Sequence, residues 1–523
     1  MPLPITFADL QNRRRMKAVI WFLAGAAILF QLTYRVLYGS TDDLIYPALG
    51  VIVIVITIRI LNDWRDGFYI FLLWLLTEDL VRKYMGNNMA IYFGKDLLVG
   101  MAYFSFVMAM RRHTVKLFRP PFLISLGLFF WIGVAQSFNP NSPSFLFSIL
   151  GLKLYFYYIP LIFLGYAIIE KEEDLRRFLV FNMAVAGIIA LLGIIQSIVG
   201  LTFLNPQVLA PDIEQLGNLT RYAPISRVLV SRPTSVFVSD GRFSSYMILM
   251  FIVGLGTAGY LLLRARKGRG IVFTAIGLTA VGGVMSGSRG AFLFIAMSAF
   301  FVSAAMIWGA PWRWRQGHRL VKAIQRSAIL IAVCVILVLL IFPEAFLARW
   351  AFYSETLSPD SAAYELGFRV WDYPFANLKG AFDDPHWVMG NGIGTASLGI
   401  QYVTRIMGVP MAQIGVESGF GTVILELGIV GLLIWLVWTG HVVLSSWNVA
   451  RKLKQTPYFP IAVAITWFTF ILLILDTFSG FSGFQNYINS AYLWLLLGIL
   501  FRLPTLSAEF QASDLPVKTS RAT

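Results

Sequence analysis

The chain has little cysteine, histidine or charge, and each shortage removes a class of protein. Its one cysteine, Cys334, lies in an apolar stretch, so disulfides and cysteine-based metal sites are excluded. Only 4 histidines are present, too few and too scattered for a metal centre, and we expect no metal or other cofactor. Charged residues make up 13% of the 523 residues, about half of what a soluble domain of this size usually carries.

Apolar residues make up most of the chain. Hydrophobic residues make up 58% of the chain and the mean hydropathy is +0.71, values typical of a protein that crosses a membrane several times. A helix needs roughly 20 apolar residues to cross about 30 Å of hydrocarbon. We therefore predict an all-α polytopic membrane protein with about 14 transmembrane helices. The predicted spans are 18–37, 44–61, 67–81, 93–110, 121–138, 145–169, 177–200, 244–263, 270–286, 290–309, 325–342, 420–445, 459–477 and 486–502.

Basic residues indicate the orientation of these spans. With a cytoplasmic N-terminus and alternating spans, 28 of the 42 Lys and Arg residues fall on the cytoplasmic side, as the positive-inside rule requires. Both termini are then cytoplasmic, and the basic start from Arg13 to Lys17 with its long apolar run is a signal anchor. The net charge of +15 is therefore mostly a topology signal, and we expect no nucleic-acid partner.

The spans divide the chain into successive parts, with one large loop between spans 11 and 12. That loop is long enough to form a small helical subdomain on the outer, periplasmic side. The predicted parts are a cytoplasmic N-terminus at 1–17, a transmembrane bundle at 18–342 with an outer loop at 201–243, the large periplasmic loop at 343–419, C-terminal transmembrane helices at 420–503 and a disordered cytoplasmic tail at 504–523.

Both outer loops carry arginines, which the orientation rule disfavours on that side. Arg232 and Arg242 lie in the first loop with Arg221 and Arg227, and the second holds Arg369 with Arg349 and Arg405. Such charge is consistent with a surface that binds an anion, although long loops also escape the orientation rule. Loops of this kind often hold functional groups.

Three features fall together on the outer side by topology alone. Arg289 lies among small residues in Ser286-Gly287-Ser288-Arg289-Gly290, where a charge is costly without a partner. Arg369 lies in the large loop, and Glu417 with Ser418 precedes the twelfth span. Helix N-termini and arginines both attract phosphate, so two arginines here would suit a diphosphate.

These residues also resemble a known family. Ser288-Arg289-Gly290 at the head of a span resembles the Ser-Arg-Gly element of the O-antigen ligase/polymerase superfamily. The large loop resembles the family's loop, since it contains an arginine helix at 367–379 and a Gly-x-Gly turn at 392–394. Arg232 and the residues up to Phe237 resemble the family's arginine-containing stretch before a span, with serine at 235 where glycine is customary.

The most distinctive element of this resemblance follows the large loop. The family's ligases show histidine with Asn, Ser or Gln, then nine residues, then Gly-x-x-Gly. Here Glu417-Ser418 is followed by nine residues and by Gly428-Ile429-Val430-Gly431, so register and glycines match while glutamate replaces histidine. The resemblance covers about residues 225–440.

What the resemblance implies is a GT-C-like, metal-independent glycosyltransferase of the bacterial inner membrane with a periplasmic active site. It would transfer or polymerise undecaprenyl-diphosphate-linked oligosaccharide repeats, with membrane lipids and polysaccharide-assembly proteins as further partners. Arg289 and Arg369 inherit catalytic, diphosphate-binding roles, Arg232 and Arg242 are further substrate-binding candidates, and Glu417 inherits the role of activating the acceptor. A carboxylate beside two arginines is a weak base, so Glu417 orients the acceptor hydroxyl or takes its proton late.

Other interpretations stay open at this stage. The glutamate fits a polymerase at least as well as a ligase that transfers glycan to lipid A core or protein. A transporter of lipid-linked glycan is a further alternative, although no repeat typical of transporters is visible. Arg289 could be an interfacial anchor, Arg369 a solvated loop residue, and Glu417-Ser418 only a helix N-cap.

A few further charges fall inside or at the ends of predicted spans. Lys153 and Asp476 are functional candidates because such charges are costly there. Glu78 and Asp79 could pair with Arg82 and Lys83, about one helical turn later, and Lys95-Asp96 could be a self-neutralising pair.

Overall fold

The structure is a computed structural model. It describes residues 41–513 except 87–88, 113–114, 116–117, 207–218, 265–266, 409–415 and most positions between 314 and 342. The chain forms two compact units, of which the first comprises Met1–Phe71 and Leu97–Ala109 and the second Leu72–Asp96 and Met110–Thr523.

The first unit contains α2 (Thr41–Asn62), the beginning of α3 (Trp64–Tyr84) and the later part of α4 (Met89–Arg111). The ring of Trp64 meets that of Phe106 edge-on at 5.0 Å, and Arg59 pairs with Asp66 at 3.1 Å. These contacts join the three helical segments of this unit.

The second unit holds the rest of α3 and α4 and nearly all other elements. Its remaining α-helices are α5 (Leu123–Gln136), α6 (Phe145–Phe156), α7 (Leu161–Ile168), α8 (Glu172–Val199), α9 (Asp240–Leu263), α10 (Arg269–Met285), α11 (Arg289–Gly309), α13 (Pro343–Leu357), α14 (Tyr373–Gly380), α15 (Ile400–Met407), α16 (Gly419–Lys452), α17 (Phe459–Phe470), α18 (Thr477–Ser479), α19 (Ser482–Gln485) and α20 (Tyr487–Ser513). It also contains the short helical turns η2 (Phe368–Asp372), η3 (Ala381–Asp383) and η4 (Ile471–Asp476), and the strands β1 (Thr220–Tyr222) and β2 (Leu229–Ser231).

Eight helices in the described part of the chain are long and apolar enough to cross a membrane. They are Ala90–Arg111, Phe145–Ile168, Glu172–Val199, Asp240–Leu263, Arg289–Gly309, Gly419–Lys452, Phe459–Ser479 and Tyr487–Glu509, and each coincides with a predicted span. The predicted class of helical, multi-pass membrane protein is thus confirmed, while the count of 14 stays a prediction. The predicted span 18–37 and most of 325–342 lie outside the described residues.

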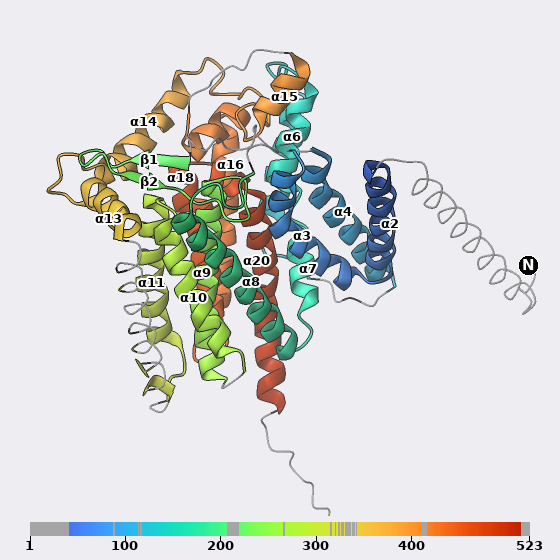
Figure 1. Ribbon diagram of the computed structural model, residues 1–523. Coiled ribbons are helices and arrows are strands. Elements are labelled where there is room, and N and C mark those ends of the chain that lie inside the picture. The colour runs from blue at the N-terminus through green and yellow to red at the C-terminus, as the bar shows by residue number, and fades with distance from the viewer. Residues whose placement is uncertain are drawn as a thin grey trace, which may run out of the picture. The chain divides into compact units, whose positions relative to one another are not determined.

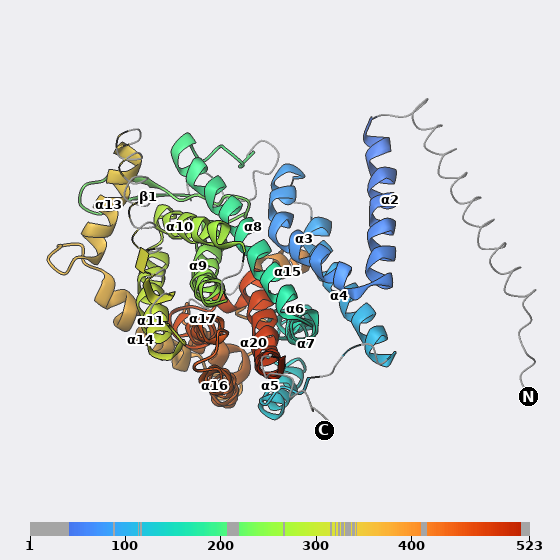
Figure 2. The same cartoon turned by 90° about the horizontal axis from the view of Figure 1, so that it is seen from below.

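Helix α9 lies at the centre of the second unit. It packs against α8, α10, α11, α17 and α20, which surround it when the helices are viewed end-on (Figure 2). Glycines permit the close approach: a side chain at Gly256 would meet Ala464, and one at Gly254 would meet Ile276. Within the most apolar stretch of α9, 89% of the residues are buried.

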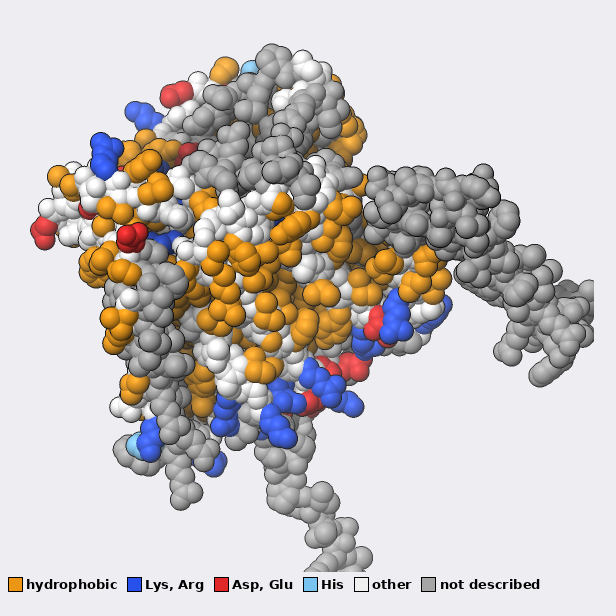
Figure 3. Space-filling model, viewed as in Figure 1, with side chains coloured by type: hydrophobic (Ala, Val, Ile, Leu, Met, Phe, Trp, Pro, Cys, Tyr) orange, Lys and Arg blue, Asp and Glu red, His pale blue; other side chains and the backbone are white. Residues whose placement is uncertain are grey.

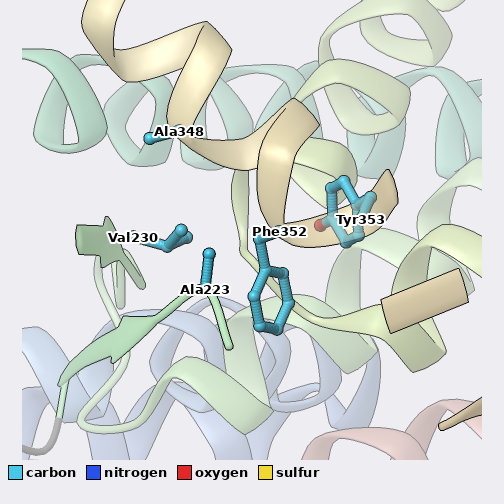
Figure 4. Packing of buried hydrophobic residues seen from close by; sticks show 5 residues of the cluster. All are labelled: Ala223, Val230, Ala348, Phe352 and Tyr353. Atoms are coloured by element: carbon cyan, nitrogen blue, oxygen red, sulfur yellow. The ribbon is translucent and has the colours of Figure 1, made fainter. Parts of the chain in front are cut away.

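The β1–β2 hairpin and helices α13, α14 and α15 gather where α9, α11, α16 and α20 begin, here called the loop end (Figure 1). Strands β1 and β2 form an antiparallel hairpin with Arg221 opposite Val230, a small addition to the predicted all-α fold. Ala223, Val230, Ala348, Phe352 and Tyr353 form a buried apolar cluster that joins this hairpin to α13 (Figure 4). The β1–β2 hairpin and α13 therefore share one core.

Charged and apolar side chains lie at different levels along the helix bundle. On the face shown in Figure 3, hydrophobic side chains cover the middle of the helices, and lysine and arginine gather at the end away from the loops. The last helix, α20, continues through Pro504 to Ser513, beyond the predicted end at residue 503.

Candidate functional site

Arg289 is positioned by a tight turn between α10 and α11. The Ser286 hydroxyl donates to the Gly283 carbonyl, and Gly287 adopts a left-handed φ of 65°, which glycine accepts at little cost. The Ser288 hydroxyl then accepts from the amide of Ala291 and caps α11. The motif therefore makes Arg289 the first residue of α11, at the loop end.

Arg289 and Arg369 converge on one carboxylate. Arg289 Nη1 lies 2.5 Å from Oε2 of Glu365, and Arg369 Nε lies 3.6 Å from the same oxygen. Arg289 lies at the start of α11, 76 residues before Glu365, and Arg369 lies in the turn η2, four residues after it. Both arginines nevertheless contact the same carboxylate oxygen. The structure thus brings together the two arginines that the motifs singled out.

Two more arginines lie near this pair. Arg232, 14% exposed, forms an ion pair with Asp240 at the start of α9. Partial desolvation and then the positive charges of Arg232 and Arg289 lower the pKa of Arg221 on β1. We call Arg221, Arg232, Arg289 and Arg369, with Asp240 and Glu365, the arginine cluster. Its four cations exceed its two carboxylates by two positive charges.

Glu417 is linked to the arginine cluster through Tyr373. The ring of Tyr373 lies under the guanidinium of Arg369, at 5.0 Å, and its hydroxyl lies near the Glu417 carboxylate. Desolvation and then the interaction with this carboxylate raise the pKa of Tyr373. The amide of Glu417 donates to Oδ1 of Asn377, and Ser418 caps α16, so the exposed carboxylate is held just outside the helix start.

Arg242, the remaining predicted substrate-binding residue, pairs elsewhere. Its Nη1 lies 2.9 and 2.7 Å from the two carboxylate oxygens of Asp79. Residues two positions apart on a helix point about 200° apart. Asp240 therefore faces Arg232 in the arginine cluster, while Arg242 faces the other side of α9.

Arg349 has a structural place beside the arginine cluster. Its Nε donates to the Met285 carbonyl at 2.9 Å and its Nη2 to the Ser231 carbonyl at 2.8 Å. The side chain is only 3% exposed, and burial lowers the pKa of Arg349 to about 10. It therefore ties α13 to the end of α10 and to β2, which holds the loop over the bundle.

The Gly-rich turn of the large loop docks on a break in α16. Gly428 has a φ of 73°, and a side chain there would collide with the Val388 carbonyl. Two residues earlier, the buried Glu426 accepts from the hydroxyls of Tyr155 and Ser397 at 2.9 and 2.7 Å. Glu426 thereby positions the end of the loop, a role that its apolar sequence context did not indicate.

The charges inside the helices pair differently from the sequence expectation. Lys95 pairs with Glu78 at 3.1 Å and Asp96 with Lys153 at 2.5 Å, so the expected Lys95–Asp96 pair is wrong. Neighbouring residues on a helix point about 100° apart and cannot face each other. The expected pairing of Arg82 with Glu78 and Asp79 is confirmed, at 3.6 Å to each.

Lys83 and Asp476 are placed by different contacts. The Lys83 ammonium donates to Oγ1 of Thr234 and to the Ser235 carbonyl. Asp476 ends η4, and a side chain at Gly483 would collide with its carboxylate. Among the described residues, no group of three or more His, Cys, Asp or Glu side chains could hold a metal ion.

The comparisons with known proteins add no relative. No protein-family model, no curated protein and no solved structure matches the chain. The chemistry of the site is therefore inferred from its residues alone. The guanidinium groups of Arg289 and Arg369 can bind phosphate oxygens, and the exposed carboxylate of Glu417 can accept a hydrogen bond from a hydroxyl.

The structural role of Arg349 leads to a first prediction. Arg349→Gln should lower the free energy of unfolding by about 2 kcal/mol, because two buried carbonyls lose their donor. Thermal unfolding of the purified protein and proteolysis of the 343–408 loop measure this loss. Arg369→Gln is the matched control, since its half-exposed ion pair contributes less than about 1 kcal/mol. Equal stability of the two variants would contradict the assignment.

Proposed function

We propose that the chain is a glycosyltransferase of the bacterial inner membrane that acts on undecaprenyl-diphosphate-linked oligosaccharide repeats at the periplasmic face. The observation that carries this proposal is the shared contact of Arg289 and Arg369 with one oxygen of Glu365. A carboxylate is a small planar anion, and two guanidiniums that grip it can also grip phosphate oxygens. The surplus of positive charge in the arginine cluster suits a diphosphate, which carries more charge than Glu365.

In the proposed reaction, the acceptor hydroxyl attacks the anomeric carbon of the donor sugar. The bond between that carbon and the diphosphate oxygen breaks, and its electron pair leaves with the carrier diphosphate. Arg289 and Arg369 neutralise the charge that develops there, so the chemistry needs no metal. Glu417, whose amide is held by Asn377, orients the acceptor and takes its proton as the anomeric bond breaks.

The orientation of the protein in the membrane supports a periplasmic site. The positive-inside rule assigns the lysine- and arginine-rich end of the bundle in Figure 3 to the cytoplasm. The loop end, where the arginine cluster lies, then faces the periplasm. The motifs around Arg289 and Glu417 resemble those of the O-antigen ligase/polymerase superfamily, and the glutamate in place of histidine favours a polymerase.

The decisive experiment supplies the purified protein with a carrier-linked repeat unit and separates the products on a gel. A ladder of products is the result expected of a polymerase. One glycan block added to lipid A core would indicate a ligase instead. Absence of any covalent product would overturn the enzymatic proposal and favour transport.

A second prediction tests the diphosphate grip. Arg289→Lys keeps the charge but loses the paired N–H groups, so activity should fall about 10- to 100-fold. Activity is measured as ladder formation in the gel assay. Arg451→Lys is the control. Arg451 lies in the last turn of α16, at the end of that helix away from Glu417, so this variant should retain full activity. Full activity in Arg289→Lys would count against the diphosphate role.

A third prediction concerns Glu417. Glu417→Gln should lower turnover at least about 100-fold, because the amide cannot take the acceptor proton. Binding of the carrier diphosphate should stay within about twofold of the native value. Glu344→Gln in the same loop serves as the control. If donor binding disappears while residual turnover persists, Glu417 belongs to the donor site instead.

A further inference from the structure

A second group of charged side chains lies buried in the second unit, separate from the arginine cluster. It draws on the last turns of α3, the first turns of α4, the last turn of α6 and the start of α9. We call it the lysine cluster, and its members are Glu78, Asp79, Arg82, Lys95, Asp96, Lys153 and Arg242.

Five members of the lysine cluster form a chain of ion pairs, and the sixth and seventh, Asp96 and Lys153, pair with each other and meet the chain at Tyr92, whose ring centre lies 3.2 Å from Lys95 and 4.9 Å from Lys153. Lys95 pairs with Glu78, and Arg82 bridges Glu78 and Asp79. Arg242 closes on Asp79 at 2.7 Å. Glu78 and Lys95 are fully buried, whereas Lys153, Asp96 and Arg242 keep 17%, 13% and 23% of their side chains exposed. We call the three partly exposed residues, Lys153, Asp96 and Arg242, the rim of the cluster, because they are the members that a ligand can reach first.

The charges of the lysine cluster do not balance. Four cations face three carboxylates, and an uncompensated charge is costly among membrane-spanning helices. Two tyrosine rings offset part of this cost: Lys95 lies 3.2 Å from the ring centre of Tyr92 and 4.4 Å from that of Tyr487. A bound anion would offset the rest.

We propose that the lysine cluster is a second anion site, which binds a phosphate group carried by a lipid. The depth of the lysine cluster below the helix starts favours a lipid-linked phosphate over a soluble anion. Asp96 and Lys153 lie about two turns beyond the starts of α4 and α6, or about 10 Å below them. A phosphate reaches that depth most readily when it is attached to a lipid tail.

The segment 232–242 joins the two clusters. Arg232 and Asp240 belong to the arginine cluster, while the amide of Val238 donates to Asp79 and Arg242 pairs with it. Two phosphate groups bound at the two clusters would thus be positioned by one short segment. Resting on the proposed function, the second site would hold the diphosphate of a carrier-linked acceptor. A polymerase that joins two carrier-linked repeats binds two diphosphates, whereas a ligase needs one.

The rim pair Asp96–Lys153 allows a sharp test, because it can be broken from either end. Asp96→Asn raises the surplus charge of the cluster and Lys153→Gln removes it, although both delete the same ion pair. The probes are a polyprenyl diphosphate and phosphatidylglycerol, titrated against the full-length protein and followed by native mass spectrometry. The Arg289→Gln background weakens the first site, so that the second is measured alone.

In that background, Asp96→Asn should bind the probe about tenfold more tightly and Lys153→Gln about tenfold more weakly, with Lys153→Arg near the native value. Selective binding of the polyprenyl diphosphate identifies the carrier as the source of the phosphate, and equal binding of phosphatidylglycerol identifies a membrane phospholipid. Equal weakening in Asp96→Asn and Lys153→Gln, or no binding of either probe, would overturn the second site.

This result is independent of the glycan assay. If the two variants split as expected but no glycan product forms, the anion site stands and the proposed function fails. If a ladder of products forms but the two variants bind alike, the proposed function stands and the second site fails.

Discussion

The Glu365 carboxylate, held between Arg289 and Arg369, is the contact on which the rest of the site depends. It joins the start of α11 to the turn η2, two elements that the chain otherwise leaves far apart. Through Tyr373 the same turn reaches Glu417 at the start of α16. Without this contact, four like-charged arginines would have only Asp240 to offset them, so another anion would be strongly attracted to the position of the Glu365 carboxylate.

The surrounding packing keeps this arrangement in register. The apolar cluster of Figure 4 and the two carbonyls bound by Arg349 fix α13 over the ends of the hairpin and α10. Glu426 and the break at Gly428 fix the other end of the large loop on α16. The loop is therefore anchored on both sides of η2, which presents Arg369. Such support is what a site that binds a charged group needs in order to stay preorganised.

Much of the fold could be predicted from the sequence, since long apolar runs in a membrane can only be helices. Arg289 and Glu417 could also be found, because each stands at a helix start marked by small or capping residues. Glu365 and Tyr373 could not, since nothing in their local sequence distinguishes them from other loop residues. The pairings of Arg242 and Lys95 were missed because they depend on the angle at which each side chain leaves its helix.

We propose that a phosphate group of the substrate takes the place of the Glu365 carboxylate between Arg289 and Arg369. Isothermal titration of inorganic pyrophosphate into the purified protein and its Glu365→Gln variant tests it most directly. The neutral amide competes less for Arg289 and Arg369, so pyrophosphate should bind about tenfold more tightly to Glu365→Gln than to the native chain. Unchanged or weaker binding in that variant would mean that Glu365 only stabilises the loop, and it would contradict a phosphate site at Arg289 and Arg369.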